Sequence, residues 1–100
     1  MIEIRGGILG LRWAPEVILF LAPGPQRFNR LLEGIEGISD RVLSERLRDL
    51  ERVGLAYRRV DAGPPVRVFY ELTADGRRYV EPLRMLAALE RETLEVAAVG

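Results

Sequence analysis

The chain contains 100 residues, with 15 arginines, 15 acidic residues, no lysine, no histidine and no cysteine. An apolar content of 48% allows one domain with a real core and excludes a disordered tail. The absence of cysteine excludes disulfides, thiolate metal sites and thiol nucleophiles, and the absence of histidine removes the usual general base near neutral pH. We therefore expect a protein that is not an enzyme, with no catalytic residue, no metal and no cofactor.

Membrane attachment is not expected either. The apolar stretch at residues 17–22 is only six residues long, far too short to span a bilayer. Residues 1–10 contain an acidic residue and lack the basic start and long apolar run of a signal peptide. We expect a cytoplasmic protein with a single domain over residues 1–100.

The charges balance overall but are unevenly distributed. Residues 41–59 hold six arginines and three acidic residues, so this segment carries an excess of positive charge within a neutral chain. A basic patch of this kind attracts a DNA phosphate backbone. A solvated helix face would produce the same pattern, so charge alone leaves both interpretations open.

Two short helices are expected first. The first covers residues 14–21, with Pro15 in its first turn, where proline is tolerated, and Pro23 beyond its end. The second covers residues 27–33, where apolar residues recur at spacings of three and four, and Gly34 ends it.

The third helix is the most informative and is expected over residues 39–53, with Ser39 as its N-cap. Its buried face should consist of Leu43, Leu47, Leu50 and Val53, with Val42 beside them. On the opposite side, within about 40° of one another at 100° per residue, lie Arg41, Arg48 and Arg52. Arg46 falls on the core side, so we expect it to play a structural role with an acidic partner.

A β-hairpin should follow Gly54, because the periodicity changes there to two. Residues 55–60 and 66–72 alternate in character, and a Gly-Pro-Pro turn at residues 61–65 separates them. We expect the hairpin to occupy residues 56–72.

The last predicted element is a helix over residues 74–97, capped by Thr73. Pro82 lies too deep in it for a first turn, so we expect a kink or a restart there. The helix and the N-terminal segment carry apolar residues that need cover: Val80, Leu83, Leu86, Ala87, Leu94, Ile2, Ile4, Ile8 and Leu9. We expect an obligate homodimer to bury them together with Met85.

The order helix, helix, helix, hairpin, helix is typical of a winged helix-turn-helix, a mainly α-helical fold with a β-hairpin wing. The third helix would enter the major groove, and the hairpin would reach the adjacent backbone. Folds of this kind also serve as protein-interaction modules without DNA binding, and this alternative stays open.

The motifs in this chain resemble the HxlR-type winged helix-turn-helix regulators over about residues 12–89. The motifs that carry the resemblance are Gly24-Pro25-x-Arg27-Phe28, Gly37-Ile38-Ser39-x-Arg41-Val42-Leu43-Ser44 and Pro64-Pro65-x-Arg67-Val68-x-Tyr70-x-Leu72-Thr73. The resemblance implies a homodimeric transcriptional regulator that binds double-stranded DNA at a roughly palindromic operator. Residues 39–53 would be the recognition helix and residues 56–72 the wing, within a DNA-binding core of about residues 12–73.

The sequence departs from the family pattern in three places. The cysteine that usually precedes the first conserved helix, through which some members sense oxidants, is absent. Leu11-Arg12 replaces a common Gly-Lys, and Phe69 replaces an acidic residue of the wing. We expect Phe69 to pack against the protein, and we expect no control by thiol oxidation. Control by a small-molecule effector in an apolar dimer cleft, or by protein level alone, stays open.

Six residues are predicted to contact DNA: Ser39, Arg41, Ser44, Arg48, Arg58 and Arg67. Arg41 and Arg48 would lie in or beside the major groove, and Arg67 on the wing would hold a phosphate. Ser39 is an N-cap in the first place, but its hydroxyl can also reach a phosphate. Arg52 is expected to be solvated, and Trp13 is expected in the core.

Overall fold

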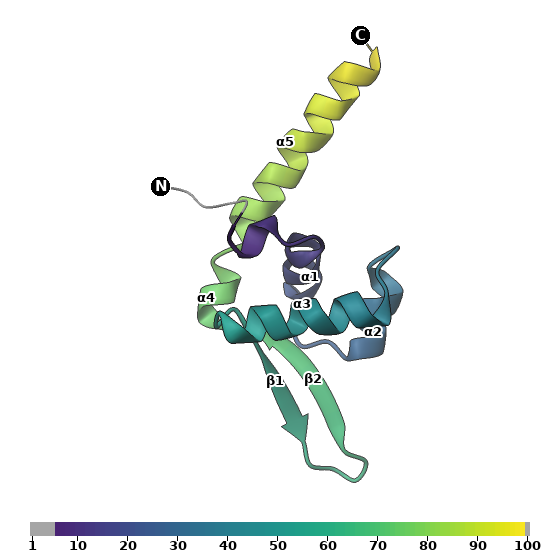
Figure 1. Ribbon diagram of the computed structural model, residues 1–100, viewed down its shortest axis with the longest axis vertical. Helices are drawn as coiled ribbons and strands as arrows, with labels where there is room; N and C mark the ends of the chain where they lie inside the picture. Colours follow the sequence, from purple (N-terminus) through teal and green to yellow (C-terminus); the bar gives the residue numbers. More distant parts are fainter. Residues whose placement is uncertain (1–5, 100) are drawn as a thin grey trace.

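The computed structural model describes residues 6–99 as a mainly helical fold with a two-stranded antiparallel hairpin, which confirms the predicted fold class. In Figure 1, α3 crosses the front of α1, the hairpin projects below it, and α5 extends away at the opposite end. The elements in chain order are η1 Ile8–Gly10, α1 Ala14–Leu21, α2 Phe28–Gly34, α3 Asp40–Arg52, β1 Ala56–Asp61, β2 Arg67–Leu72, α4 Ala74–Arg77 and α5 Val80–Val99.

Local capping explains where α3 begins and ends. The Ser39 hydroxyl accepts a hydrogen bond from the Val42 N–H at 3.2 Å, as its N-cap position predicts. At the other end Gly54 takes a φ of +79°, a left-handed conformation that glycine adopts without strain. This lets the Leu55 N–H reach back to the Leu50 carbonyl at 2.9 Å and close the helix.

The core lies between α1 and α3, with the base of the hairpin and the start of α5 around it. Its fully buried side chains come from three helices, namely Val17, Ile18, Leu21, Leu31, Leu43, Leu47 and Leu50. Trp13 is half-buried and packs against this cluster, in agreement with its predicted place. The prediction for Val53 is wrong, because this side chain is 45% exposed. It follows the last helical residue, with φ −92° and ψ 5°, and so leaves the buried stripe of α3.

The hairpin is anchored at two places. At its base, Ala56 pairs with Leu72, and both side chains are buried. Halfway along β2, the backbone of Tyr70 pairs with that of Gln26, which precedes α2, through N–H···O bonds of 2.9 and 2.8 Å. The wing is therefore fixed to the segment that leads into α2. The second helix itself begins at Phe28, one residue later than predicted, because Arg27 is extended.

The C-terminal part corrects the prediction of one helix with a break at Pro82. The chain forms two helices, α4 and α5, and the break lies at residues 78–79. Pro82 is only the third residue of α5, where its missing N–H would be unpaired in any case. The Thr73 side chain caps α4 by accepting from the Gly76 N–H at 3.0 Å. A side chain at position 76 would overlap the Leu55 carbonyl, so close packing of α4 on this segment needs glycine there.

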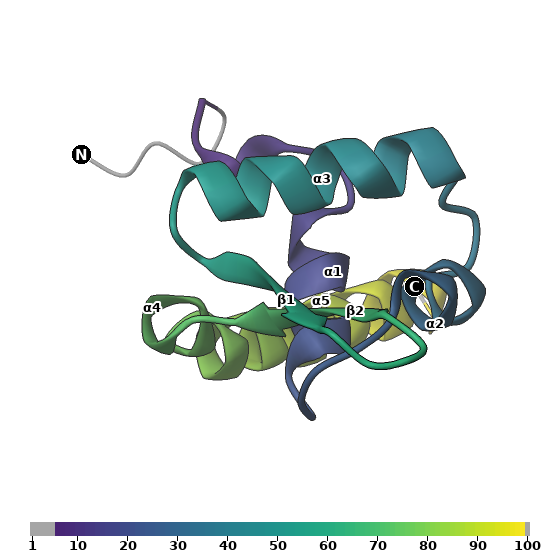
Figure 2. The ribbon, with the colours of Figure 1, turned by 90° about the horizontal axis from the view of Figure 1, so that it is seen from below.

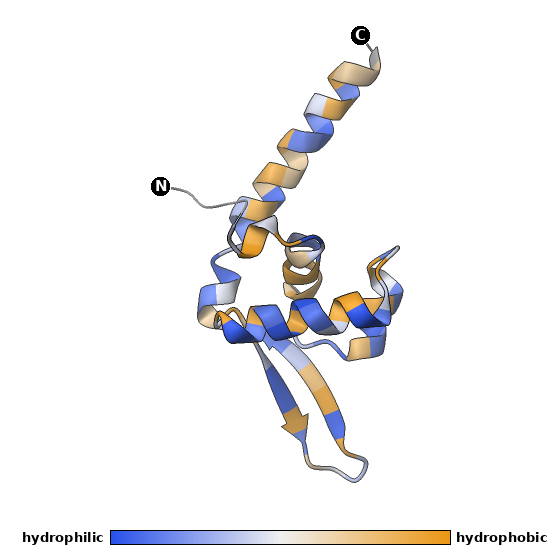
Figure 3. Ribbon diagram, in the orientation of Figure 1, coloured by the Kyte–Doolittle hydropathy of each residue, from blue (hydrophilic) through white to orange (hydrophobic). Residues whose placement is uncertain are grey.

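The predicted unpartnered stripe of the last helix is also corrected in part. Val80 and Leu83 pack against the core of their own chain, and Leu83 is only 7% exposed. Further along α5, Met85, which we expected to be buried in a dimer, is 67% exposed in the single chain. Ile8 and Leu9 are half-buried against the core, whereas Ile2 and Ile4 lie outside the described residues. Figure 3 shows hydrophobic residues along α5 well beyond the body of the domain.

Within residues 6–99, no helix is both long and apolar enough to cross a membrane.

Candidate nucleic-acid interface

The outer face of α3 presents two arginines that have no acidic partner among the residues the structure describes. Arg41 and Arg48 are exposed on the side of the helix opposite Leu43, Leu47 and Leu50. Among the described side chains, no carboxylate lies within 4.0 Å of either guanidinium group. They are two turns apart, about 10 Å along the helix axis. Both charges are therefore free to bind an anionic partner.

The other polar residues at this face of α3 differ in whether their side chains already have partners within the protein. Arg52 is exposed, as expected, but its guanidinium group lies 3.3 Å from the Asp49 carboxylate. Ser39 is exposed and its oxygen already accepts the capping bond, so its hydroxyl hydrogen stays available to donate. Ser44 is half-buried between the arginine face and the core.

Arg46 has the structural role predicted for it. Its Nε donates to the Arg12 carbonyl at 2.6 Å, and its Nη1 lies 3.1 Å from Asp49 Oδ2. The side chain is only 16% exposed. Arg46 therefore connects α3 to the segment before α1, where Trp13 sits with a left-handed φ of 76°.

The two wing arginines of the predicted interface lie on opposite faces of the hairpin. Arg58 pairs across the strands with Tyr70, and Arg67 pairs with Asp61. Since side chains alternate between the faces of a strand, Arg58 shares a face with the buried Ala56, and Arg67 lies on the other. Both are exposed, and within the described part of the chain neither has a carboxylate within 4.0 Å. They can approach a duplex only from different sides of the wing.

A cluster around Glu71 covers the face of the hairpin that carries Arg67. The Tyr57 hydroxyl donates to Glu71 at 2.6 Å, and an Arg59 nitrogen lies 3.4 Å from the same carboxylate. Arg59 also lies 3.6 Å from Asp61 and stacks over the Phe69 ring at 5.0 Å. The prediction that Phe69 packs against the protein is therefore confirmed.

This cluster changes the electrostatics of the wing. The hydrogen bond from Tyr57 to the Glu71 carboxylate raises the pKa of the Tyr57 hydroxyl above its ordinary value of 10.0. Arg59 is compensated by two acids, so Arg58 and Arg67 are the wing cations that remain unpaired among the described residues. The cluster was not predicted from the sequence. The two-residue period places Tyr57 and Arg59 on one face of β1, but only the register of the hairpin brings Glu71 beside them.

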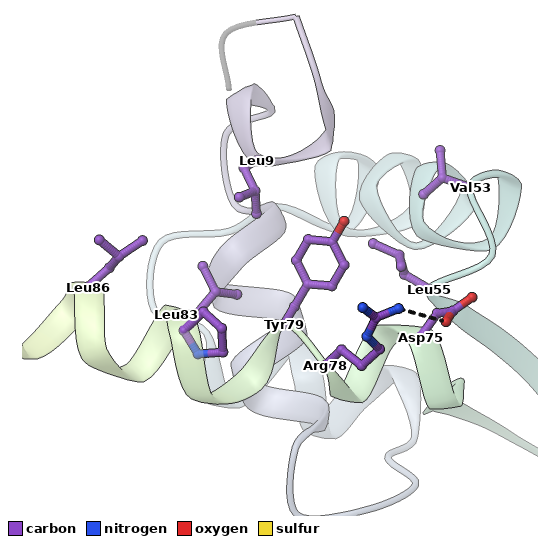
Figure 4. Close-up of a pocket in the computed structure, with 9 residues that line it drawn as sticks. Leu9, Val53, Leu55, Asp75, Arg78, Tyr79, Leu83 and Leu86 are labelled. Carbon is purple, nitrogen blue, oxygen red and sulfur yellow. Dashed lines mark ion pairs between the residues drawn. The ribbon is translucent and has the colours of Figure 1, made fainter. Parts of the chain in front are cut away.

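An apolar groove lies on the other side of the domain, where η1, the end of α3 and the start of α5 meet. Its volume is about 560 Å³, and Figure 4 shows Leu9, Leu83 and Leu86 around it, with Tyr79 between them and Leu55. At its rim Arg78 pairs with Asp75 at 3.7 Å. No group of three or more metal-binding side chains comes together within the described residues.

Comparison with known proteins agrees with this geometry. The chain is 42% identical over 74 residues to the HTH-type transcriptional regulator YodB of Bacillus subtilis, an alignment that covers 74% of this chain and 66% of YodB. It is 41% identical over 70 residues to the uncharacterized HTH-type transcriptional regulator YvaP of the same organism, covering 70% of this chain and 65% of YvaP. The chain thus spans slightly less than two thirds of the length of these relatives.

Comparison with solved structures also finds regulators of this kind. The reduced form of YodB superposes with a TM-score of 0.75 at 37% identity, covering 81% of this chain and 79% of that one. The redox regulator HypR in its reduced form gives a TM-score of 0.83 at 26% identity, covering 93% and 92% of the two chains. Residues 8–97 match the family described as HxlR-like helix-turn-helix. The chain therefore belongs to the HxlR-like family of winged helix-turn-helix proteins, and the relatives compared above are named as transcriptional regulators.

Proposed function

We propose that the protein binds a roughly palindromic operator in double-stranded DNA as a homodimer, with α3 in the major groove and the hairpin on the neighbouring backbone. The observation that carries this proposal is the pair Arg41 and Arg48, exposed on α3 opposite the leucine core and without an acidic partner among the described residues. An unpaired arginine presents a planar fork that matches the O6 and N7 acceptors of guanine. Arg41, nearer the start of α3, is the base-reading residue of the proposal.

Arg48 and Ser44 lie beside Arg41 in or next to the major groove. The remaining predicted contacts hold the backbone, and Ser39 donates its hydroxyl to a phosphate beside the start of α3. Arg67 and Arg58 extend from opposite faces of the wing to phosphates. Contacts of this second kind position the protein on the duplex and carry no sequence information.

The dimer is proposed from α5. One arc of about 100° around this helix carries four exposed apolar side chains, those of Met85, Leu86, Leu89 and Val96. Of the stripe predicted from the sequence, only Leu86 belongs to this arc, and Leu94 is exposed but lies outside it. Such an arc exposed to water is typical of a helix that packs on a partner. Leu86 also lines the groove of Figure 4, so a second copy docked on α5 would cover both surfaces. Residues 12–73 would then be the DNA-binding core, and the N-terminal segment and residues 74–97 would serve dimerisation.

Two-fold symmetry connects the dimer to the operator. A symmetric pair of recognition helices reads two half-sites about 34–36 Å apart, one turn of DNA. The operator would therefore repeat with opposite polarity at a centre-to-centre spacing of about 10 base pairs.

The experiment that tests this function compares three variants on specific and random duplexes over a salt series. Arg41→Ala should lose about 1–3 kcal/mol on the specific site and relax the preference at one base pair per half-site. Arg67→Ala should weaken all sequences alike and reduce the slope of log K against log salt by about 0.9 per bound protomer. Arg91→Ala, with the same charge change on α5, is the matched control and should do neither.

If Arg41→Ala and Arg67→Ala leave both the specific affinity and the salt slope unchanged, the DNA-binding proposal fails. A protein-interaction module without DNA binding would then replace it.

A further inference from the structure

A second groove, of about 430 Å³, lies between α2 and the wing. Its walls come from two separate parts of the chain, the start of α2 and the start of β2. It is lined by Arg27, Phe28, Asn29, Arg30, Val66 and Val68. Figure 2, seen from the side toward which the wing projects, shows α2 and the hairpin on the same side of the molecule. None of these residues is among the six predicted DNA contacts.

The groove is positively charged, and no acidic residue of the described chain pairs with its arginines. Arg27 and Arg30 are both exposed, and in the part of the chain that the structure describes no carboxylate lies within 4.0 Å of either. Arg58 adds a third cation from the same side, because it shares a hairpin face with Val68. Arg67 and the Glu71 cluster lie on the opposite face. The groove and Arg67 are therefore separate basic surfaces.

The geometry of the groove is fixed by the backbone. The paired Gln26 and Tyr70 backbones hold the segment before α2 against the middle of β2. Phe28 packs against the core and anchors the start of α2 from within. The two walls therefore keep one spacing, and a ligand that bridges them meets a preorganised site.

We infer that this groove binds the sugar–phosphate backbone of the duplex, with Arg27 and Arg30 on phosphate oxygens and Val66 against the sugar. Guanidinium groups bind phosphate through charge-assisted, bidentate hydrogen bonds. Val66, which is 63% exposed at the edge of the groove, offers an apolar surface that suits the deoxyribose and not a charged group. Charge complementarity and continuity with Arg58 on the wing favour DNA as the occupant.

The inference rests on the proposed DNA-binding function and adds a contact to it. One clamp, formed by α2 and the wing, would hold a backbone segment separate from the bases that α3 reads. Binding at this clamp would be independent of sequence and would respond to charge alone.

The test uses the full chain and the double variant Arg27→Ala/Arg30→Ala. The slope of log K against log salt should become shallower by about 1.8 per bound protomer, equally on specific and random duplexes. Hydroxyl-radical footprinting should lose protection at a discrete set of backbone positions, while the protection of guanines by α3, measured by dimethyl sulfate methylation, persists. The double variant Arg27→Lys/Arg30→Lys should restore most of the slope, because phosphate binding depends on the positive charge that lysine keeps. If the arginines had only a structural role, lysine would not be expected to restore the slope.

Arg84→Ala/Arg91→Ala is the matched control, with the same charge change on α5. A salt slope of the Arg27→Ala/Arg30→Ala variant equal to that of this control overturns the inference, and so does a lysine variant that behaves like the alanine variant. Failure of the proposed DNA-binding function would give a different result, because the unmodified chain would then show no salt-dependent binding to any duplex.

Discussion

Replacing Arg46 by alanine should destabilise the fold and leave the DNA-contacting face of α3 in place, whereas replacing Arg48 should do the reverse. The two arginines lie two residues apart on α3. Arg46 is 16% exposed and makes a 2.6 Å hydrogen bond to the Arg12 carbonyl. Arg48 is exposed and has no acidic partner among the described residues. The pair therefore separates stability from binding within one helix.

The magnitude follows from the contacts that are lost. A hydrogen bond from a charged donor contributes about 1.5–3 kcal/mol to the free energy of unfolding. The partly exposed ion pair with Asp49 adds about 0.2–1 kcal/mol. Together they predict a loss of about 2–4 kcal/mol for Arg46→Ala, which for a chain of this length lowers Tm by about 8–32 °C. Arg48→Ala should stay within about 0.5 kcal/mol of the unmodified chain.

The assay is thermal and urea unfolding followed by circular dichroism, at one fixed protomer concentration because a dimer makes Tm depend on concentration. DNA affinity is measured well below the lower Tm. Asp49→Ala is the companion variant: it removes the ion pair, leaves the bond to Arg12, and should cost less than Arg46→Ala. An Arg46→Ala variant that melts within about 2 °C of the unmodified chain would refute the reasoning, since 1 kcal/mol already shifts Tm by about 4–8 °C.

Three further predictions concern the wing, α5 and redox control. The pKa of Tyr57 should lie above 10.0, because its neutral hydroxyl donates to Glu71, so the stabilisation of the wing by this bond is present below pH 10 and lost as the pH rises through the raised pKa. NMR of the tyrosine rings measures this pKa, which Glu71→Gln should lower. A Tyr57 pKa at or below 10.0 in the unmodified chain would contradict the prediction. Leu89→Glu should yield a folded monomer in sedimentation at micromolar concentration, because Leu89 is 57% exposed in the single chain and lies on the proposed dimer face. Arg91→Gln, with the same change in net charge, should stay dimeric. A dimeric Leu89→Glu variant would disprove the role of this face. Diamide should leave DNA affinity unchanged in an anisotropy assay, because the chain has no cysteine; release that dithiothreitol reverses would contradict this.

Local sequence signals predicted much of the fold. Ser39 and Gly54 marked the ends of α3 because capping depends on the residue itself and its immediate neighbours. The core face of α3 and the structural role of Arg46 followed from helical periodicity alone. Val53 was misassigned because that periodicity stops where the helix stops.

The remaining differences depend on contacts between distant parts of the chain. The close packing of Gly76 on the Leu55 carbonyl, which fixes α4 against this segment, is a contact that no local pattern reveals. The pairing of Gln26 with Tyr70, which joins α2 to the wing, is likewise a long-range contact.

The sequence predicted which residues form the candidate site better than it predicted how those residues are arranged in space. The unpaired state of Arg41 and Arg48 agrees with the helical wheel. The opposite faces of Arg58 and Arg67, and the compensation of Arg59 by Glu71, require the register of the hairpin. Register is set by the turn and by the buried base of the wing, so sequence alone left these arginines grouped together.

Selection of binding sites from random duplexes tests the central claim most directly. The unmodified chain should enrich one motif with two inverted half-sites centred about 10 base pairs apart. Arg41→Ala, selected in parallel, should keep this spacing and lose the preference at one base pair in each half-site. Failure of the unmodified chain to enrich any motif, or a motif left unchanged by Arg41→Ala, would contradict the placement of α3 in the major groove.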